Sequence, residues 1–137
     1  MKKIGALIMI VAIVLVVGIA VMAYAESKMF TLLDNATVGV GPVIQIPYKA
    51  FRHWYCEVTV SGRPDNVTFA LEGNISGGAL FESMIGNDSQ SMSQREIQKG
   101  LLIFYLTDRP AKAMRATIVS MPGGVNPRVA MMCLGVE

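Results

Sequence analysis

The chain has too few histidines, cysteines and clustered charges for most kinds of catalytic or metal site. Its 137 residues include one histidine, two cysteines and one tryptophan, and only 16% of them are Asp, Glu, Lys or Arg. A single histidine, with no nucleophile motif around any serine, does not make a Ser-His-Asp triad. Two isolated cysteines beside it lack the ligand spacing of a zinc site. The sequence therefore predicts a protein that is not an enzyme and needs no cofactor or metal.

Basic charge is also sparse. The chain has 12 Lys+Arg against 10 Asp+Glu, and Lys2 and Lys3 account for the whole of this excess. The other basic residues are scattered along the chain, whereas a nucleic-acid-binding protein needs them gathered in a patch. We therefore expect no nucleic acid as a partner.

What the chain does have is one long uncharged run, Ile4 to Ala25, directly after Lys2 and Lys3. As a helix this run would measure about 33 Å, close to the hydrocarbon thickness of a bilayer. Ala23-Tyr24-Ala25 also fits a signal-peptidase site, although the run is longer than the usual signal-peptide core. A retained anchor and a cleaved signal peptide therefore both stay open, with a prepilin-type leader cut after Gly5 as a third alternative.

The two lysines should stay in the cytoplasm, so the rest of the chain is expected outside it, either membrane-anchored or secreted. The bilayer is then a partner of the apolar helix. The residues that we expect to anchor this helix are Ile4, Leu7, Ile10, Val14, Val17 and Val21. Residues 26–36 are assigned as a linker, with a helical extension or an early strand as alternatives, and residues 37–137 as one domain.

Beyond position 36, short apolar runs are separated by turns rich in Gly, Pro and Asn. This pattern is typical of an all-β antiparallel sandwich, Ig-like or jelly-roll, behind the N-terminal helix. Val43–Pro47 is expected at a sheet edge because prolines bound it, and Leu101–Leu106 in a sheet centre because it is apolar throughout. Gly86–Gly100 reads as a polar loop with one helical turn at residues 93–98. The seven expected strands are residues 43–47, 53–60, 67–71, 79–85, 101–106, 113–120 and 128–134.

The two cysteines, Cys56 and Cys133, lie in strand-like runs near the start and the end of this domain. Outside the cytoplasm such a pair favours a disulfide, with two buried free thiols as the alternative. Each cysteine falls on the expected inward face of its strand, together with Val58 in one case and Met131 in the other. The two are therefore expected to meet across the core.

Four Asn-X-Ser/Thr sequons make candidate glycosylation sites, with turn-forming asparagines as the alternative explanation. Their asparagines are Asn35, Asn66, Asn74 and Asn87.

His53 could line a binding site, but a position at the start of a strand explains it as well. Glu72 and Glu82 flank the turn at residues 73–78 and could form a glycosidase pair. The pattern favours two surface glutamates over that pair.

Leu71-Glu72-Gly73 ends one expected strand, and Arg115–Ser120 (RATIVS) precedes a glycine-rich loop and the last strand. With these motifs, residues 31–135 resemble a small β-sandwich module of tailed-phage and other virion structural proteins. The chain departs from that family at Ser76-Gly77-Gly78 and at Phe81, where the family often has Asp-Gly and then Trp. The apolar leader is also unusual for such modules. The resemblance implies a structural or adhesive role without catalytic residues.

These observations predict a non-enzymatic structural protein of a virion or cell-surface assembly, tethered by its N-terminal helix with the sandwich facing out. It should associate with itself or with other structural proteins of the same assembly, through edge strands such as Val43–Pro47. The alternative is a secreted or surface module that recognises carbohydrate or a host receptor through its loops. Gly86–Gly100 and Met121–Pro127 would then carry the recognition.

Overall fold

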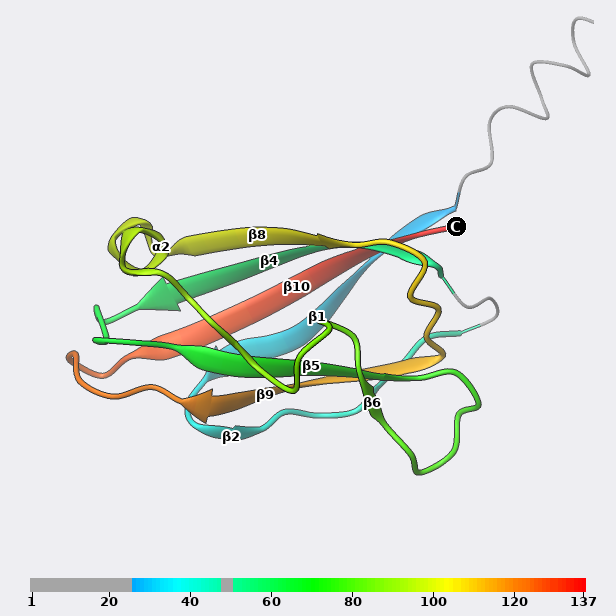
Figure 1. Ribbon diagram of the computed structural model, residues 1–137, viewed down its shortest axis with the longest axis horizontal. Helices are drawn as coiled ribbons and strands as arrows, with labels where there is room; N and C mark the ends of the chain where they lie inside the picture. Colours follow the sequence, from blue (N-terminus) through cyan, green and yellow to red (C-terminus); the bar gives the residue numbers. More distant parts are fainter. Residues whose placement is uncertain (1–25, 48–50) are drawn as a thin grey trace, which may run out of the picture.

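The computed structural model describes residues 26–47 and 51–137, which form a sandwich of two antiparallel sheets (Figure 1). The strands and the helix of this part are β1 (Ser27–Ala36), β2 (Gly39–Val40), β3 (Ile44–Gln45), β4 (His53–Ser61), β5 (Thr68–Asn74), β6 (Glu82–Ser83), β7 (Gln90–Ser91), α2 (Gln94–Lys99), β8 (Leu101–Leu106), β9 (Ala113–Ser120) and β10 (Arg128–Val136). One sheet has the order β1-β10-β4-β8. The other has the order β2-β9-β5-β6, with β3 also paired to β9 and β7 to β5. The predicted antiparallel all-β architecture is confirmed.

Side-chain alternation along the strands builds the core between the two sheets. Trp54, Cys56 and Val58 of β4 are buried, and the residues between them are not. The facing sheet contributes Phe69 and Ile118, both fully buried. Because successive side chains of a strand point to opposite faces, the alternation of residues along these strands accounts for the inward positions.

The segment assigned as a linker, residues 26–36, is instead almost entirely strand β1, paired antiparallel with β10. Phe30 and Leu32 are buried, whereas Met29 and Thr31 between them are exposed. Burial of these two side chains gives the segment the driving force to join the sheet. The alternative of an early strand was therefore the better one.

Strand β8 is not central, as its continuous apolar run suggested, but lies at the edge of the four-stranded sheet. Leu102 and Leu106 point into the core, whereas Leu101, Ile103 and Tyr105 are exposed on the opposite face. The prediction was wrong because it assumed that an apolar run must be buried on both faces. Here the outer half of the run stays on the surface.

The expected strand at residues 79–85 is reduced to β6, two residues long, since Gly77 and Gly78 directly precede the segment and Leu80 near its start is highly exposed. Residues 43–47 do contain an edge strand, β3, as predicted. The predicted helical turn is confirmed as α2. Ser93 and Glu96 form a capping box at its start, and Gly100 ends it in the left-handed conformation at φ 69°.

Three aromatic rings close one end of the core. Phe30, Phe51 and Trp54 pack with ring centroids 5.8–6.0 Å apart, and the indole of Trp54 donates a hydrogen bond to the Arg109 carbonyl at 2.7 Å. The rings lie over Gly135 of β10, where a Cβ would stand 2.8 Å from both Phe51 and Trp54. Only glycine therefore fits at this position without displacing a ring.

The predicted N-terminal helix, with its anchor residues Ile4, Leu7, Ile10, Val14, Val17 and Val21, lies outside the described residues. Within the part of the chain that the structure describes, no helix has the length and hydrophobicity needed to cross a bilayer.

Candidate functional site

Cys56 and Cys133 form a disulfide, as predicted, but the two cysteines do not meet across the core. They are direct cross-strand partners on β4 and β10, neighbours in the four-stranded sheet, with Cα atoms 4.1 Å apart. Both residues are fully buried. The disulfide therefore fixes the register of two adjacent central strands of one sheet and does not cross-link the two sheets.

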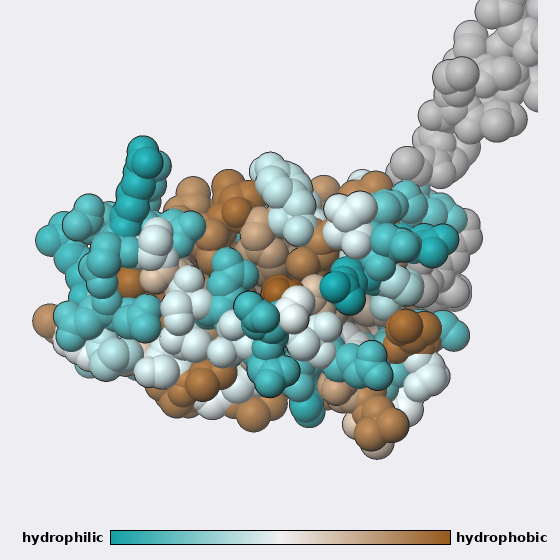
Figure 2. Space-filling model, in the orientation of Figure 1, coloured by the Kyte–Doolittle hydropathy of each residue, from teal (hydrophilic) through white to brown (hydrophobic). Residues whose placement is uncertain are grey.

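The surface of the four-stranded sheet that points away from the core is largely apolar, and we call it the outer face. Its exposed large apolar side chains come from all four strands and are Met29, Tyr55, Leu101, Ile103, Tyr105 and Met132. Figure 2 shows hydrophobic side chains gathered along the upper side of the molecule, where β8 runs in Figure 1. Soluble monomers rarely expose a contiguous apolar patch of this kind, so the outer face is a candidate interaction surface.

Register places Thr31, Met132, Glu57 and Ile103 side by side in one row across the outer face. Glu57 is the one charged residue of this row and is only partly exposed. Charged side chains are depleted at the centre of protein interfaces. This row therefore combines two apolar side chains, Met132 and Ile103, with a single charge.

The neighbouring row contains the exposed tyrosines Tyr55 and Tyr105, which are direct cross-strand partners. Their rings pack edge to face with centroids 4.6 Å apart. Hydrogen bonding to the Tyr105 side chain and the nearby charge of that residue, with smaller effects of desolvation and of Glu57, raise the pKa of Tyr55 above its ordinary value of 10.0. The two rings thus form one continuous aromatic surface on the outer face.

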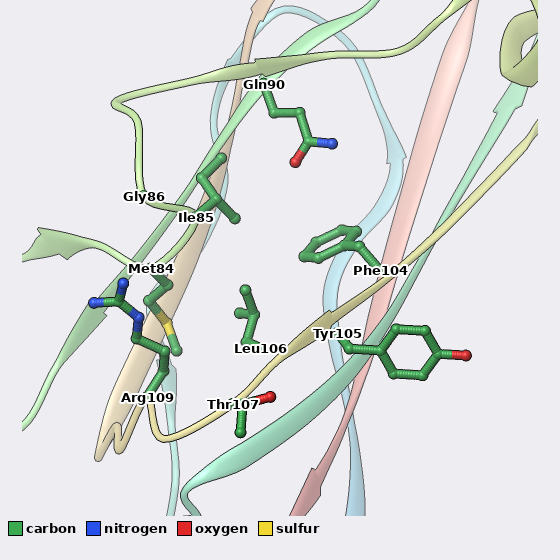
Figure 3. A pocket seen from close by; sticks show the side chains of 9 residues that line it. All are labelled: Met84, Ile85, Gly86, Gln90, Phe104, Tyr105, Leu106, Thr107 and Arg109. Carbon is green, nitrogen blue, oxygen red and sulfur yellow. The ribbon is translucent and has the colours of Figure 1, made fainter.

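The outer face ends at the free edge of β8. Beside this edge lies an open hollow of about 350 Å³, lined by β8 on one side and by residues 84–86 and Gln90 on the other. Figure 3 shows Phe104 and Leu106 on the side of the hollow and Tyr105 pointing away from it. A second hollow of about 420 Å³ lies between α2 and the start of β8. The two hollows therefore border β8 at both ends of the strand.

The two glutamates considered as a glycosidase pair have a structural explanation. Glu72 and Arg115 are cross-strand partners, and Arg115 Nε donates to the Glu72 carboxylate at 2.6 Å, a contact that raises the pKa of Arg115. The Arg115 guanidinium also lies 4.4 Å from the ring centre of Phe81. Glu82 is exposed on β6.

His53 lies at the start of β4, where its Nδ1 accepts a hydrogen bond from the Asp108 amide at 3.3 Å.

The four sequon asparagines occupy different environments. Asn35 and Asn87 are exposed and Asn66 is partly exposed, so glycosylation at these positions stays a prediction. Asn74 is 2% exposed, and its Nδ2 donates to the carbonyls of Gly78 and Leu80 at 2.7 and 2.5 Å. Its Oδ1 accepts from the Gly77 amide at 2.7 Å. A glycan on Asn74 would have to break this turn, which the side chain organises from inside.

The two loops proposed for recognition both pack on the turn after β4, at the end of the sandwich opposite Ser27 (Figure 1). Gln94 donates a hydrogen bond to the Asp65 carbonyl at 2.8 Å, and the Val125 amide donates to the Gly62 carbonyl at 2.8 Å. Segments far apart in the sequence are thus neighbours in space.

Among residues 26–47 and 51–137, no three His, Cys, Asp or Glu side chains gather into a group that could hold a metal ion.

The two sheets and the disulfide together define an antiparallel β-sandwich with a disulfide between two neighbouring strands of one sheet, and solved structures similar to this chain are known. The chain is similar to the SPBc2 prophage-derived protein YomS, with a TM-score of 0.52 and 16% identity, over 84% of this chain and 96% of that one. A further match is the PBSX exported protein XepA, with a TM-score of 0.47, 14% identity and coverage of 82% of this chain and 38% of that one. PirA matches with a TM-score of 0.33, 13% identity and coverage of 83% and 95%.

No family model matches the sequence, and no curated protein is similar enough to count as a relative. At this level of identity the similarity to YomS defines the fold and nothing more. The expectation of a β-sandwich is thereby confirmed, whereas the particular tailed-phage module is not.

Proposed function

We propose that the chain is a non-enzymatic structural protein of a phage-derived assembly, held at a bilayer by the helix predicted for Ile4–Ala25. The observation that carries the proposal is the apolar outer face of the four-stranded sheet, which extends over all four strands. Soluble monomers rarely expose such a face, whereas the subunits of an assembly bury apolar surface against one another. The prophage origin of YomS supports the phage context.

The position of the first described strand fits a tether. Ser27 pairs with Val136, so the chain enters and leaves the sandwich at the same end (Figure 1). A helix attached there would hold this end at the bilayer and turn the opposite end outward. The outer face would then run away from the membrane, within reach of neighbouring subunits tethered in the same way.

The test starts from the chain recovered from its native source. The first measurement is whether the chain occurs in assembled particles, and the second is whether it resists extraction from membranes at alkaline pH. We expect an intact mass matching Met1–Glu137 and resistance to extraction. Val14→Asp combined with Val17→Asp should release the chain, because each charge costs about 2.5–3.5 kcal/mol at a helix centre in a bilayer. Val38→Asp with Val40→Asp is the matched control on exposed residues and should leave extraction unchanged. Absence of the chain from both particles and membranes would contradict the proposal.

A second candidate function is recognition of carbohydrate or a host receptor by the loop end of the sandwich. It is favoured by the contact of both candidate loops with one turn and by a hollow of about 380 Å³ between that turn and α2. Arg63 and Gln98 line this hollow and could both hydrogen-bond a sugar. A glycan array probed with the full chain tests it. Binding that Arg63→Ala abolishes would support this function, and silence across the array would count against it.

A further inference from the structure

We propose that β8 pairs antiparallel with β8 of a second copy, about a two-fold axis at Ile103. Two four-stranded sheets would then join into one continuous sheet with a doubled outer face. This inference rests on the proposed function and names a partner for the edge of the same sheet. It follows from the hydrogen-bonding state of the β8 edge, from the protection of the other edges and from the sequence of the strand.

The backbone of β8 has free hydrogen-bonding groups along its outer edge. The Val60 amide donates to the Gly100 carbonyl at 2.9 Å, and the register pairs Val58 with Leu102. Antiparallel ladders alternate, so the even-numbered residues of β8 bond to β4 and the odd-numbered ones turn their N–H and C=O groups outward. Among residues 26–47 and 51–137, none forms a strand pair with that side of β8.

Other sheet edges carry the features that prevent edge-to-edge pairing, and β8 has none of them. Two register shifts interrupt β1, whose sequence also includes Lys28 and Asp34. Strands β2 and β3 are two residues long and are flanked by prolines at positions 42 and 47. Strand β8 is six residues long, pairs in regular register with β4 and has no charge, proline or glycine. Such an edge is the kind that pairs with another strand.

A second copy is the partner that the sequence of β8 fits. With the axis at Ile103, Ile103 pairs with itself and Leu101 pairs with Tyr105, so every cross-strand pair on the outer face is apolar. Glu57 lies one strand further in on each copy, beside Ile103. Three strand spacings separate the two carboxylates by about 14 Å, beyond the Debye length at physiological salt. Like charges therefore do not oppose the pairing.

The area of the contact indicates how strong the pairing is. Leu101, Ile103 and Tyr105 are 36%, 40% and 67% exposed. Together these side chains expose roughly 300 Å² of surface on each copy. With the backbone edges added, the contact between the two copies has a total area of roughly 800 Å², about half that of a standard stable interface. The pairing is therefore weak between free molecules and becomes substantial where tethering to one surface raises the local concentration.

Cysteine cross-linking of the full chain in a mild detergent tests the pairing at a series of protein concentrations. Ile103→Cys adds a thiol to a protein whose two native cysteines are joined to each other. Cα atoms of a hydrogen-bonded antiparallel pair lie about 5.5 Å apart, within the range of a disulfide. We expect oxidation to give a covalent dimer at least ten times faster than for Thr31→Cys, the matched control in the same row at the opposite edge. Equal rates would overturn the proposal.

Register is tested by mixing two variants. Leu101→Cys alone should not cross-link, because its two copies would lie about 14 Å apart along the strands. Leu101→Cys mixed with Tyr105→Cys should form the mixed dimer. Cross-linking of Leu101→Cys to itself at the rate of the mixture would exclude the axis at Ile103.

Lysine substitutions separate edge pairing from face-to-face stacking of two outer faces. Ile103→Lys should lower the dimer fraction at least tenfold at a fixed concentration, measured by light scattering, whereas Met132→Lys, two strands inward, should not. Loss of the dimer with Met132→Lys would overturn edge pairing. If the chain is found in particles or membranes but never cross-links at position 103, the pairing fails while the proposed function stands. If the chain cross-links at position 103 but is absent from both particles and membranes, the pairing stands while the proposed function fails.

Discussion

Removal of the Cys56–Cys133 disulfide should lower the free energy of unfolding by about 4.5 kcal/mol. The bond joins residues 77 apart in the sequence, and that loop length gives this value in the chain-entropy description of cross-links. Both cysteines are fully buried and pair directly across β4 and β10, so the native sheet keeps its ladder when the bond is absent. The effect should therefore come mainly from the larger freedom of the unfolded chain.

The perturbation is the double variant Cys56→Ala with Cys133→Ala, and reduced wild type serves as a control that retains both side chains. Thermal unfolding of the full chain in a mild detergent, followed by circular dichroism, should show a fall in Tm of roughly 18 °C, at about 4 °C per kcal/mol for a domain of this size. Reduced wild type should fall by nearly as much. A loss below about 1 kcal/mol in both samples would refute the reasoning.

Three smaller predictions concern packing, a buried amide and a titration. Gly135→Ala should cost about 1–3 kcal/mol because its methyl group would overlap two aromatic rings, whereas Gly78→Ala should cost less than about 0.5 kcal/mol in the same denaturant titration. Asn74→Ala should cost about 1–3 kcal/mol by removing the hydrogen bonds of its side chain to the Gly77 amide and to the carbonyls of Gly78 and Leu80, and peptide mass mapping should find no glycan at this asparagine. Tyr55 should titrate above pH 10.0 by ultraviolet absorbance, and Tyr105→Phe should lower its pKa. Because the folded state holds that proton longer, the contribution of Tyr55 to stability should be fully present below pH 10.0 and should be lost as the pH rises through the pKa of the folded protein.

Local patterns in the sequence predicted much of the fold correctly. Alternation identified Trp54, Cys56 and Val58 as inward residues, and the Ser93–Glu96 spacing coincides with the capping box of α2. These features depend on residues close together in the chain, whose geometry is set by the period of a strand or by the first turn of a helix. The sequence also singled out the two cysteines that form the disulfide.

The candidate site was not predictable in the same way. The run Leu101–Leu106 gives no sign of which side chains stay exposed, because all six are apolar. Its exposed half could have been suspected only from Tyr105, whose hydroxyl favours water. Asn74 likewise looked like a surface sequon, because nothing in the sequence shows that its side chain is buried and hydrogen-bonded to the carbonyls of Gly78 and Leu80.

The sequence by itself determined that the chain is a β protein, which face of an alternating strand such as β4 is buried, and that an uncharged run precedes the sandwich. Only the tertiary structure decided that β8 lies at an edge, that β1 joins the sheet and that the two cysteines are neighbours in one sheet. The reason is physical. A period of two residues fixes the direction of a side chain relative to its own strand, but the neighbours of that strand are chosen by packing between segments that are distant in the sequence.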